Sequence, residues 1–181
     1  MKSNTILLLV ISVLMMACNQ NPQSLATNTT PAPVDGGQAT VQDDISQQNI
    51  VQVAGGSADH TTLVAALKAA EYVDALANAG PFTVFAPTNE AFDQLPPGTL
   101  DDLVKPKNQS KLRDILEYHV YIGVIRENMM KDGMKLNQAN TKNVTLTKNG
   151  DRFTVNDASI VATISCSNGI IYVVDKVLIP G

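Results

Sequence analysis

Residues 80–92, GPFTVFAPTNEAF, place a strand, a stop and a helix start within one short stretch. After the Gly-Pro turn signal come five residues suited to a buried strand. Pro87 ends that strand because it has no N–H to add to a β-ladder. Thr88 is expected to cap a helix, with Glu90 in the first turn, where negative charge is favourable. Phe92 then returns the helix to the core side. We therefore expect the rest of the chain to pack around this unit.

The first residues are typical of a bacterial lipoprotein signal peptide. Lys2 gives a positive charge, and residues 6–16 form an apolar run too short to span roughly 30 Å of hydrocarbon. Residues 14–18, LMMAC, resemble a lipobox, in which a peptidase cuts before a cysteine that carries lipid. Met15 stands where Leu is more usual. The alternative is an ordinary secretory signal in which Cys18 is incidental.

These features divide the chain into a signal peptide at residues 1–17, a polar tether at 18–46 and a globular domain at 47–181. The tether is rich in Pro, Gly, Asn, Gln, Thr and Ser, and has too little apolar surface to offset its ordering entropy. Acyl chains such as palmitate on Cys18 would form a membrane anchor, because each buried methylene contributes about 0.8 kcal/mol. Asn19 is not the Asp that resembles an inner-membrane retention signal. This favours the outer membrane in a host with two membranes, and leaves the periplasmic or surface face open.

The globular region has helical patterns first and strand patterns later. Helices are expected at residues 60–72 with Asp59 as cap, at 73–79, at 99–104, from Ser110 or Asn108 to His119, and as a short turn at 126–132. A strand is expected at residues 120–122. From residue 134 the period changes to two, and Asn149-Gly150 is a hairpin signal. Residues 170–174 form a β-branched run expected to be buried on both faces. This order predicts an α+β domain with a mainly antiparallel sheet system.

Three blocks together resemble the fasciclin domain family. They are residues 80–92, residues 116–120 (LEYHV, with a tyrosine–histidine motif) and residues 168–180 (NGIIYVVDKVLIP). The resemblance implies a wedge in which a cluster of short helices packs on an antiparallel β-sandwich. It also implies cell adhesion or protein binding outside the cytoplasm, including binding to extracellular matrix. Tyr172 departs from the family, which commonly has histidine there, so no role of that histidine is transferred.

Charge and cysteine content exclude several kinds of site. The net charge of −4 gives no basic patch for nucleic acid. With Cys18 assigned to lipid, Cys166 is alone in the mature chain and cannot form an internal disulfide. No Cys/His cluster has metal-ligand spacing, so neither a metal nor a cofactor is expected. Cys166 is interpreted as a small, half-buried apolar residue, with a reactive thiol as the alternative.

Few residues could carry catalysis or recognition. His60 is expected to be exposed, and His119 to be a core histidine bonded to backbone, with a direct contact role as the alternative. The tyrosine–histidine motif in the resembling family has been linked with receptor adhesion, so Tyr118 and His119 are candidate partner-binding residues. Asp175 interrupts an apolar run, and is expected to bond a neighbouring strand's N–H or to recognise a partner.

The sequence thus predicts a lipid-anchored cell-envelope protein that presents a fasciclin-like domain for adhesion or protein–protein binding. Its expected partners are the membrane, through Cys18, and an envelope or extracellular protein or matrix polymer. An enzyme is not expected, because no G-x-S-x-G element or other nucleophile–base arrangement is present. The first alternative is a carrier of a small apolar ligand, such as a pigment or lipid. The remote alternative is a hydrolytic enzyme built on His119.

Overall fold

The computed structural model describes residues 47–181, so the predicted signal peptide, Cys18 and the tether lie outside the described residues. The α-helices are α1 (Ile50–Gly56), α2 (Thr61–Ala69), α3 (Val73–Ala77), α4 (Asn89–Asp93), α5 (Thr99–Leu103) and α6 (Gln109–Tyr118), with 3-10 turns η2 (Ala58–His60), η3 (Pro106–Asn108) and η4 (Glu127–Met129). The strands are β1 (Phe82–Pro87), β2 (Val120–Ile122), β3 (Met134–Asn137), β4 (Asn143–Asn149), β5 (Arg152–Val155), β6 (Ala158–Cys166) and β7 (Gly169–Val174). Within this range, every helix is too short or too polar to cross a membrane.

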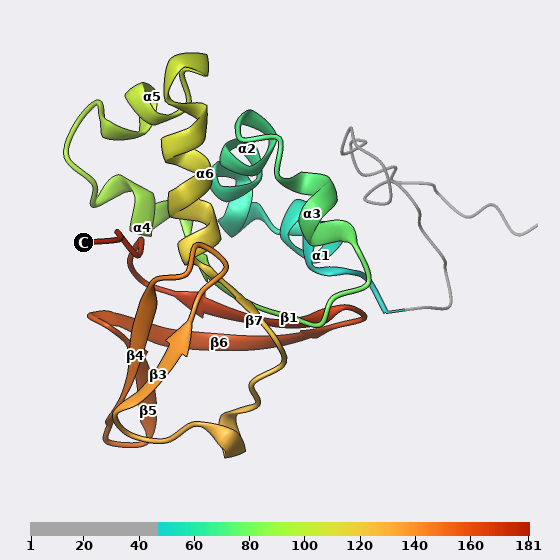
Figure 1. The fold of residues 1–181 in the computed structure, drawn as a ribbon, viewed down its shortest axis with the longest axis vertical. Helices are drawn as coiled ribbons and strands as arrows, with labels where there is room; N and C mark the ends of the chain where they lie inside the picture. The colour runs from blue at the N-terminus through green and yellow to red at the C-terminus, as the bar shows by residue number, and fades with distance from the viewer. Residues whose placement is uncertain (1–46) are drawn as a thin grey trace, which may run out of the picture. The chain divides into compact units, whose positions relative to one another are not determined.

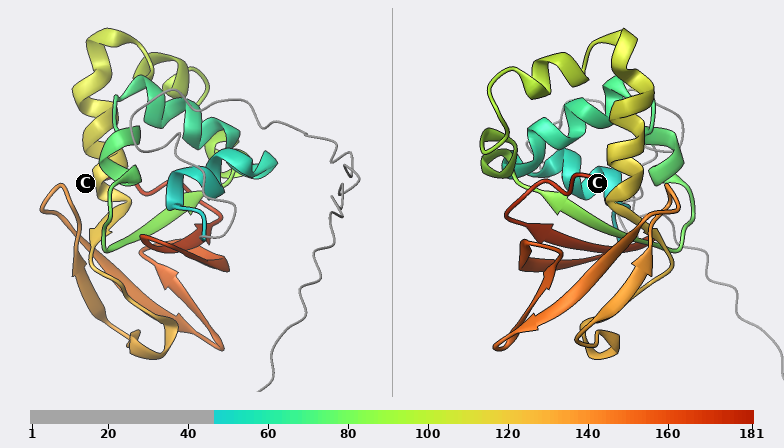
Figure 2. Two further views of the ribbon diagram at one scale, coloured as in Figure 1. Left: turned by 90° about the vertical axis from the view of Figure 1, so that its right-hand side faces the viewer. Right: turned by 60° about the vertical axis from the view of Figure 1, so that its left-hand side comes forward.

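The strands form one sheet in the order β2-β1-β7-β6-β5-β4-β3. Its two ends approach each other, since Tyr121 of β2 makes an isolated antiparallel bridge to Gln138 just after β3. The helices gather on one side of β1 and β7, and β3, β4 and β5 curve away from them (Figures 1 and 2). The predicted α+β class is confirmed. The sheet is mixed, because β1 and β7 run parallel while the other neighbours are antiparallel.

The strand-to-helix unit at residues 80–92 forms as the sequence predicts. β1 lies between β2 and β7, and five of its six residues are buried. The Thr88 side chain caps α4 by accepting a hydrogen bond from the Ala91 N–H. Asn89 has a role that the sequence does not indicate. Its side chain accepts from the Thr62 N–H and donates to the Ala58 carbonyl, so it joins α4 to the start of α2.

Two hydrophobic clusters lie on opposite faces of β1 and β7. The first lies between the sheet and the helices, and includes Val84, Ile171 and Val173. The second lies within the curve of the sheet, and includes Phe85 and Tyr172, whose rings stack with centroids 5.9 Å apart. Successive strand residues alternate between the clusters because their side chains point to opposite faces. All six residues of β7 are buried, as the β-branched run predicts.

The helix boundaries differ in detail from those predicted. The segment expected at residues 60–72 is divided into η2 and the shorter α2. The cap residue of η2 is Ser57, whose side chain accepts from the Asp59 N–H, so the prediction that Asp59 is the cap was wrong. The prediction that His60 is exposed was also wrong: it is only 5% exposed, and its Nδ1 lies 2.9 Å from the Ser57 hydroxyl.

Candidate functional site

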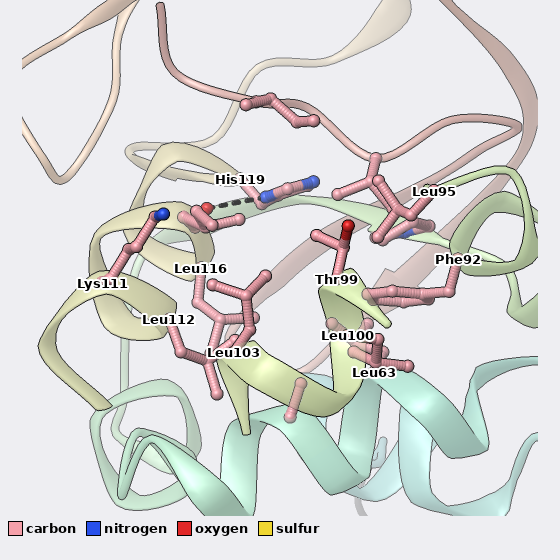
Figure 3. Close-up of a pocket in the computed structure, with 15 residues that line it drawn as sticks. Leu63, Phe92, Leu95, Thr99, Leu100, Leu103, Lys111, Leu112, Leu116 and His119 are labelled. Carbon is pink, nitrogen blue, oxygen red and sulfur yellow. Dashed lines mark hydrogen bonds between the residues drawn. The ribbon is translucent and has the colours of Figure 1, made fainter. Parts of the chain in front are cut away.

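A cavity of about 140 Å³ lies among α2, α4, α5, α6 and the segment that follows β7. Figure 3 shows leucine side chains, Phe92 and His119 converging on it. Its wall consists of Leu63, Ala66, Pro87, Phe92, Leu95, Thr99, Leu100, Leu103, Lys111, Leu112, Ile115, Leu116, His119, Val177 and Ile179. An engineered apolar cavity of about 150 Å³ stays dry and binds benzene. The cavity therefore has room for one apolar group of that size.

The structure confirms that His119 is a core histidine held by backbone groups. It is 3% exposed. Its Nε2 accepts a 2.9 Å hydrogen bond from the Leu178 N–H, and its Nδ1 lies 2.8 Å from the Ile115 carbonyl. Nε2 must therefore be unprotonated, and Nδ1 carries the hydrogen that it donates to Ile115. Burial lowers the pKa of His119 to about 4, although the hydrogen bond to Ile115 acts in the opposite direction.

Tyr118 points into the second hydrophobic cluster, which lies within the curve of the sheet. Its side chain is buried, and its hydroxyl donates to the Asn143 carbonyl and accepts from the Asn156 side-chain amide. Adjacent residues at the end of α6 thus contact different parts of the domain. A partner cannot reach either Tyr118 or His119 from the surface of the described structure. A direct contact with His119 would require the segment around Leu178 to move.

Asp175 makes the backbone hydrogen bond that the sequence suggests. Its Oδ1 accepts from the Ser159 N–H at 2.6 Å, and its own N–H donates to the Ser159 carbonyl. The residue is half-buried, so one side of it is open to solvent. It lies three residues before Leu178, on the segment that His119 holds. His119 and Asp175 thus fix this segment at two points.

Cys166 and Tyr172, which the sequence analysis also names, are both buried in the domain. Cys166 is a free, buried thiol, and burial raises its pKa to about 11, which keeps it protonated at neutral pH. Tyr172 donates its hydroxyl to the Ile125 carbonyl, and burial raises its pKa to about 12. Within residues 47–181, no group of three or more His, Cys, Asp or Glu side chains could hold a metal ion.

Neither described histidine has the surroundings of a catalytic base. Both ring nitrogens of His119 are engaged by backbone groups. His60 contacts a hydroxyl, that of Ser57, but its Nε2 is buried without a hydrogen-bond partner among the described residues. A serine–histidine pair needs a third group to orient the imidazole. The hydroxyl of Ser57 is also used to cap η2.

The sequence did not point to the cavity or to Lys111, its one charged lining residue. The lining comes mainly from four helices and the C-terminal segment, with Pro87 at the end of β1, and their convergence is a tertiary property. A weak signal was present in α6. Lys111 lies four residues before Ile115, on the same side of the helix, so its stem borders the apolar face.

The fasciclin domain model matches residues 58–180 of this chain. Protein sll1483 of Synechocystis sp. is 45% identical over 136 residues, which cover 75% of each chain. Immunogenic protein MPB70 of Mycobacterium bovis is 38% identical over 162 residues, 86% of this chain and 77% of that protein. Transforming growth factor-beta-induced protein ig-h3 of rabbit (Oryctolagus cuniculus) is 32% identical over 132 residues, 72% of this chain and 19% of that protein.

The fold is also similar to a solved structure, the FAS1 domain pair from the insect cell adhesion molecule fasciclin I. The TM-score is 0.66 at 16% sequence identity, and the match covers 74% of this chain and 51% of that one. At this level of identity the similarity establishes the fold. Several short helices packed against a seven-stranded, nearly closed mixed sheet are therefore a FAS1-type architecture.

Proposed function

Because the chain belongs to the fasciclin domain family, we propose that it is a lipid-anchored cell-envelope protein whose fasciclin domain serves adhesion or protein–protein binding. The match to the family model over residues 58–180 carries the proposal. Fasciclin I, which shares the fold, is described as a cell adhesion molecule. The surroundings of His60 and His119 support a binding role over a hydrolytic one.

The anchoring part of the proposal rests on the lipobox-like residues 14–18 and on Cys18. Replacing Cys18 by Ala should release the processed protein from membranes into the soluble fraction, because no acyl chain can then be attached. Cys166→Ala is the matched control, and should leave membrane association unchanged. If the processed Cys18→Ala protein stayed in the membrane pellet, lipid on this cysteine would not be the anchor.

We propose the outer membrane as the location in a host with two membranes, since Asn19 follows Cys18. Density-gradient separation of the two membranes tests this placement. Asn19→Asp should move the protein toward the inner-membrane fraction, because Asp resembles the retention signal. Co-migration of the unmodified protein with inner-membrane markers would contradict the proposed location. For a protein found in the outer-membrane fraction, protease treatment of intact cells distinguishes the surface face from the periplasmic face.

The binding part predicts a specific partner in the envelope or outside the cell. Crosslinking in intact cells, followed by identification of the captured protein, tests this part. The same partner should be retained by the purified domain on a column. The control is a domain of unrelated fold anchored through the same Cys18 segment. If no protein or matrix polymer is enriched relative to this control, the result would count against adhesion.

A second function, the carrying of a small apolar ligand, is favoured by the cavity among α2, α4, α5 and α6. A site of this kind is concave and mostly apolar. Mass spectrometry of organic extracts of the purified protein should then detect a stoichiometric small molecule. Leu100→Trp, which fills the cavity from α5, should remove it. Extracts that contain no such molecule, and do not differ between the two proteins, would oppose this function.

A further inference from the structure

The cavity among the helices has an uneven distribution of charge. Its wall contains one charged residue, Lys111 of α6, and no carboxylate. Eleven of the other fourteen lining residues are Leu, Ile, Val, Ala or Phe, and the remaining three are Pro87, Thr99 and His119. Both nitrogens of His119 are occupied by backbone groups, so its ring offers no charged or free hydrogen-bonding group to a ligand.

Lys111 is positioned at the margin of the cavity and is exposed to solvent (Figure 3). The described ion pairs engage four other basic residues, which are Lys105, Lys107, Arg113 and Lys176. None of the ion pairs among residues 47–181 involves Lys111. Long cationic side chains lay their methylene stem along apolar surface and keep the ammonium in water. Lys111 therefore places a positive charge, without a protein counter-ion, where the cavity meets solvent.

The volume limits what can enter. About 140 Å³ is close to the volume of the engineered cavity that accepts benzene. A tail of roughly six carbon atoms, benzene-sized, fits this space, whereas a long pigment would extend far beyond it. The most exposed of the large apolar lining residues is Ile179, at 60%, so the tail of a somewhat longer ligand could continue along the C-terminal segment.

We propose that this cavity binds a small anionic amphiphile, a monocarboxylate with a single apolar tail, whose carboxylate pairs with Lys111. This inference rests on the second function proposed above and specifies its ligand class. The apolar wall takes the tail, and the single unpaired cation at the margin selects the head group. A neutral ligand with the same tail gains the apolar contacts and lacks the ion pair.

Octanoate and 1-octanol are matched probes, because they share a chain length and differ in charge. Residues 19–181 are used at pH 7 and below the micellar range, since this fragment keeps all of residues 47–181 and both hydrophobic clusters while lacking Cys18. Binding is followed by NMR shifts of the methyl groups of Leu63, Leu100 and Leu112. Octanoate should bind more tightly than 1-octanol by about two- to fivefold, and added salt should reduce this advantage.

Lys111→Gln should lower octanoate affinity to that of 1-octanol and leave 1-octanol binding unchanged. Lys68→Gln is the control, because Lys68 is an exposed lysine of α2 that does not line the cavity. Equal binding of the two probes, with no effect of Lys111→Gln, would overturn the charge selectivity and leave apolar ligand binding intact. Failure of both probes to shift the cavity methyl groups would overturn the ligand function itself. The same failure of both probes is expected if the cavity receives an apolar side chain of a protein partner and no small molecule.

Discussion

His119 joins α6 to the C-terminal segment through two backbone hydrogen bonds. The neutral imidazole is suited to this position, since one nitrogen donates to Ile115 while the other accepts from Leu178. Protonation would place a second N–H against the Leu178 N–H and would bury an uncompensated charge. The residue therefore fixes a segment that also forms part of the cavity wall.

The low pKa of His119 predicts a pH-dependent stability. In the unfolded chain this histidine takes up a proton below its usual pKa of about 6.5, whereas in the folded protein it stays neutral down to about 4. The unfolded state therefore binds more protons between these values. The free energy of unfolding should fall as the pH is lowered through this window, by up to about 1.4 kcal/mol per pH unit, and should be flat with respect to this group above pH 6.5.

Urea unfolding at a series of pH values measures this dependence. His119→Gln keeps an acceptor for Leu178 but cannot titrate, so its slope between pH 4 and 6.5 should be smaller than that of the unmodified protein. Burial also lowers the pKa of His60, which contributes in the same direction, so His60→Gln is the necessary comparison. Identical slopes for the unmodified protein and His119→Gln would show that His119 does not titrate as its burial indicates.

Variants of Asp175 distinguish a structural role of this side chain from a role in partner recognition. Asp175→Ala leaves the Ser159 N–H without its acceptor, and should lower the free energy of unfolding by about 1–3 kcal/mol. Asp175→Asn keeps a neutral acceptor and should cost less. If Asp175 also recognises a partner by its charge, Asp175→Asn should reduce partner capture while the protein remains folded. Unchanged capture by this variant would leave Asp175 with the structural role alone.

At the scale of elements, Asn168 connects the turn between β6 and β7 to two helices. Its side-chain oxygen accepts from the Ile50 N–H at the start of α1. Its amide donates to the carbonyls of Leu76 and Asn78 at the end of α3. The turn also lies close to β1, because the Phe82 N–H donates to the Asn168 carbonyl. A Cβ on the next residue, Gly169, would collide with the backbone of Phe82, so glycine is required there.

Asn168→Ala should therefore loosen α1 and α3 together. Three hydrogen bonds are lost in a buried site, and we expect a loss of about 2–4 kcal/mol in the free energy of unfolding. Asn168→Asp keeps the acceptor for Ile50 and removes both donors. In this variant, backbone amides of α1 should therefore stay better protected from hydrogen exchange than those of α3. Hydrogen exchange resolved by residue measures both effects. A uniform change across the domain, or no change, would contradict this connecting role.

At the scale of the whole described domain, the two hydrophobic clusters share β1 and β7. Residues of these strands alternate between the clusters, so neither cluster can be lost without disturbing the strands that support the other. Only four ion pairs are found within residues 47–181, and each includes a side chain more than 40% exposed. Such pairs contribute little to stability. Apolar packing across the shared sheet is therefore the main source of cooperativity.

This arrangement predicts one unfolding transition. Leu76→Ala in the first cluster and Leu146→Ala in the second should each lower the free energy of unfolding by about 2–5 kcal/mol. In both variants the far-ultraviolet signal and the tyrosine near-ultraviolet signal should change at the same urea concentration. A variant in which one signal is lost well before the other would indicate that the clusters unfold independently.

Local sequence determined the elements whose signals are short in range. The strand-to-helix unit at residues 80–92, the cap at Thr88, the Asn149-Gly150 hairpin and the fully buried β7 follow from spacing, turn chemistry and apolar pattern. The core role of His119 and the backbone bond of Asp175 also followed, because a polar group within an apolar run needs a partner.

The tertiary structure alone decided which distant segments meet. The parallel pairing of β1 with β7, the burial of His60 and the bonds made by Asn89 and Asn168 join residues far apart in sequence. The cavity is the clearest case, since it exists only where α2, α4, α5, α6 and the C-terminal segment converge around Lys111. Periodicity reports which face of an element is apolar. The space left between such faces, and the charge at its margin, depend on how the elements pack.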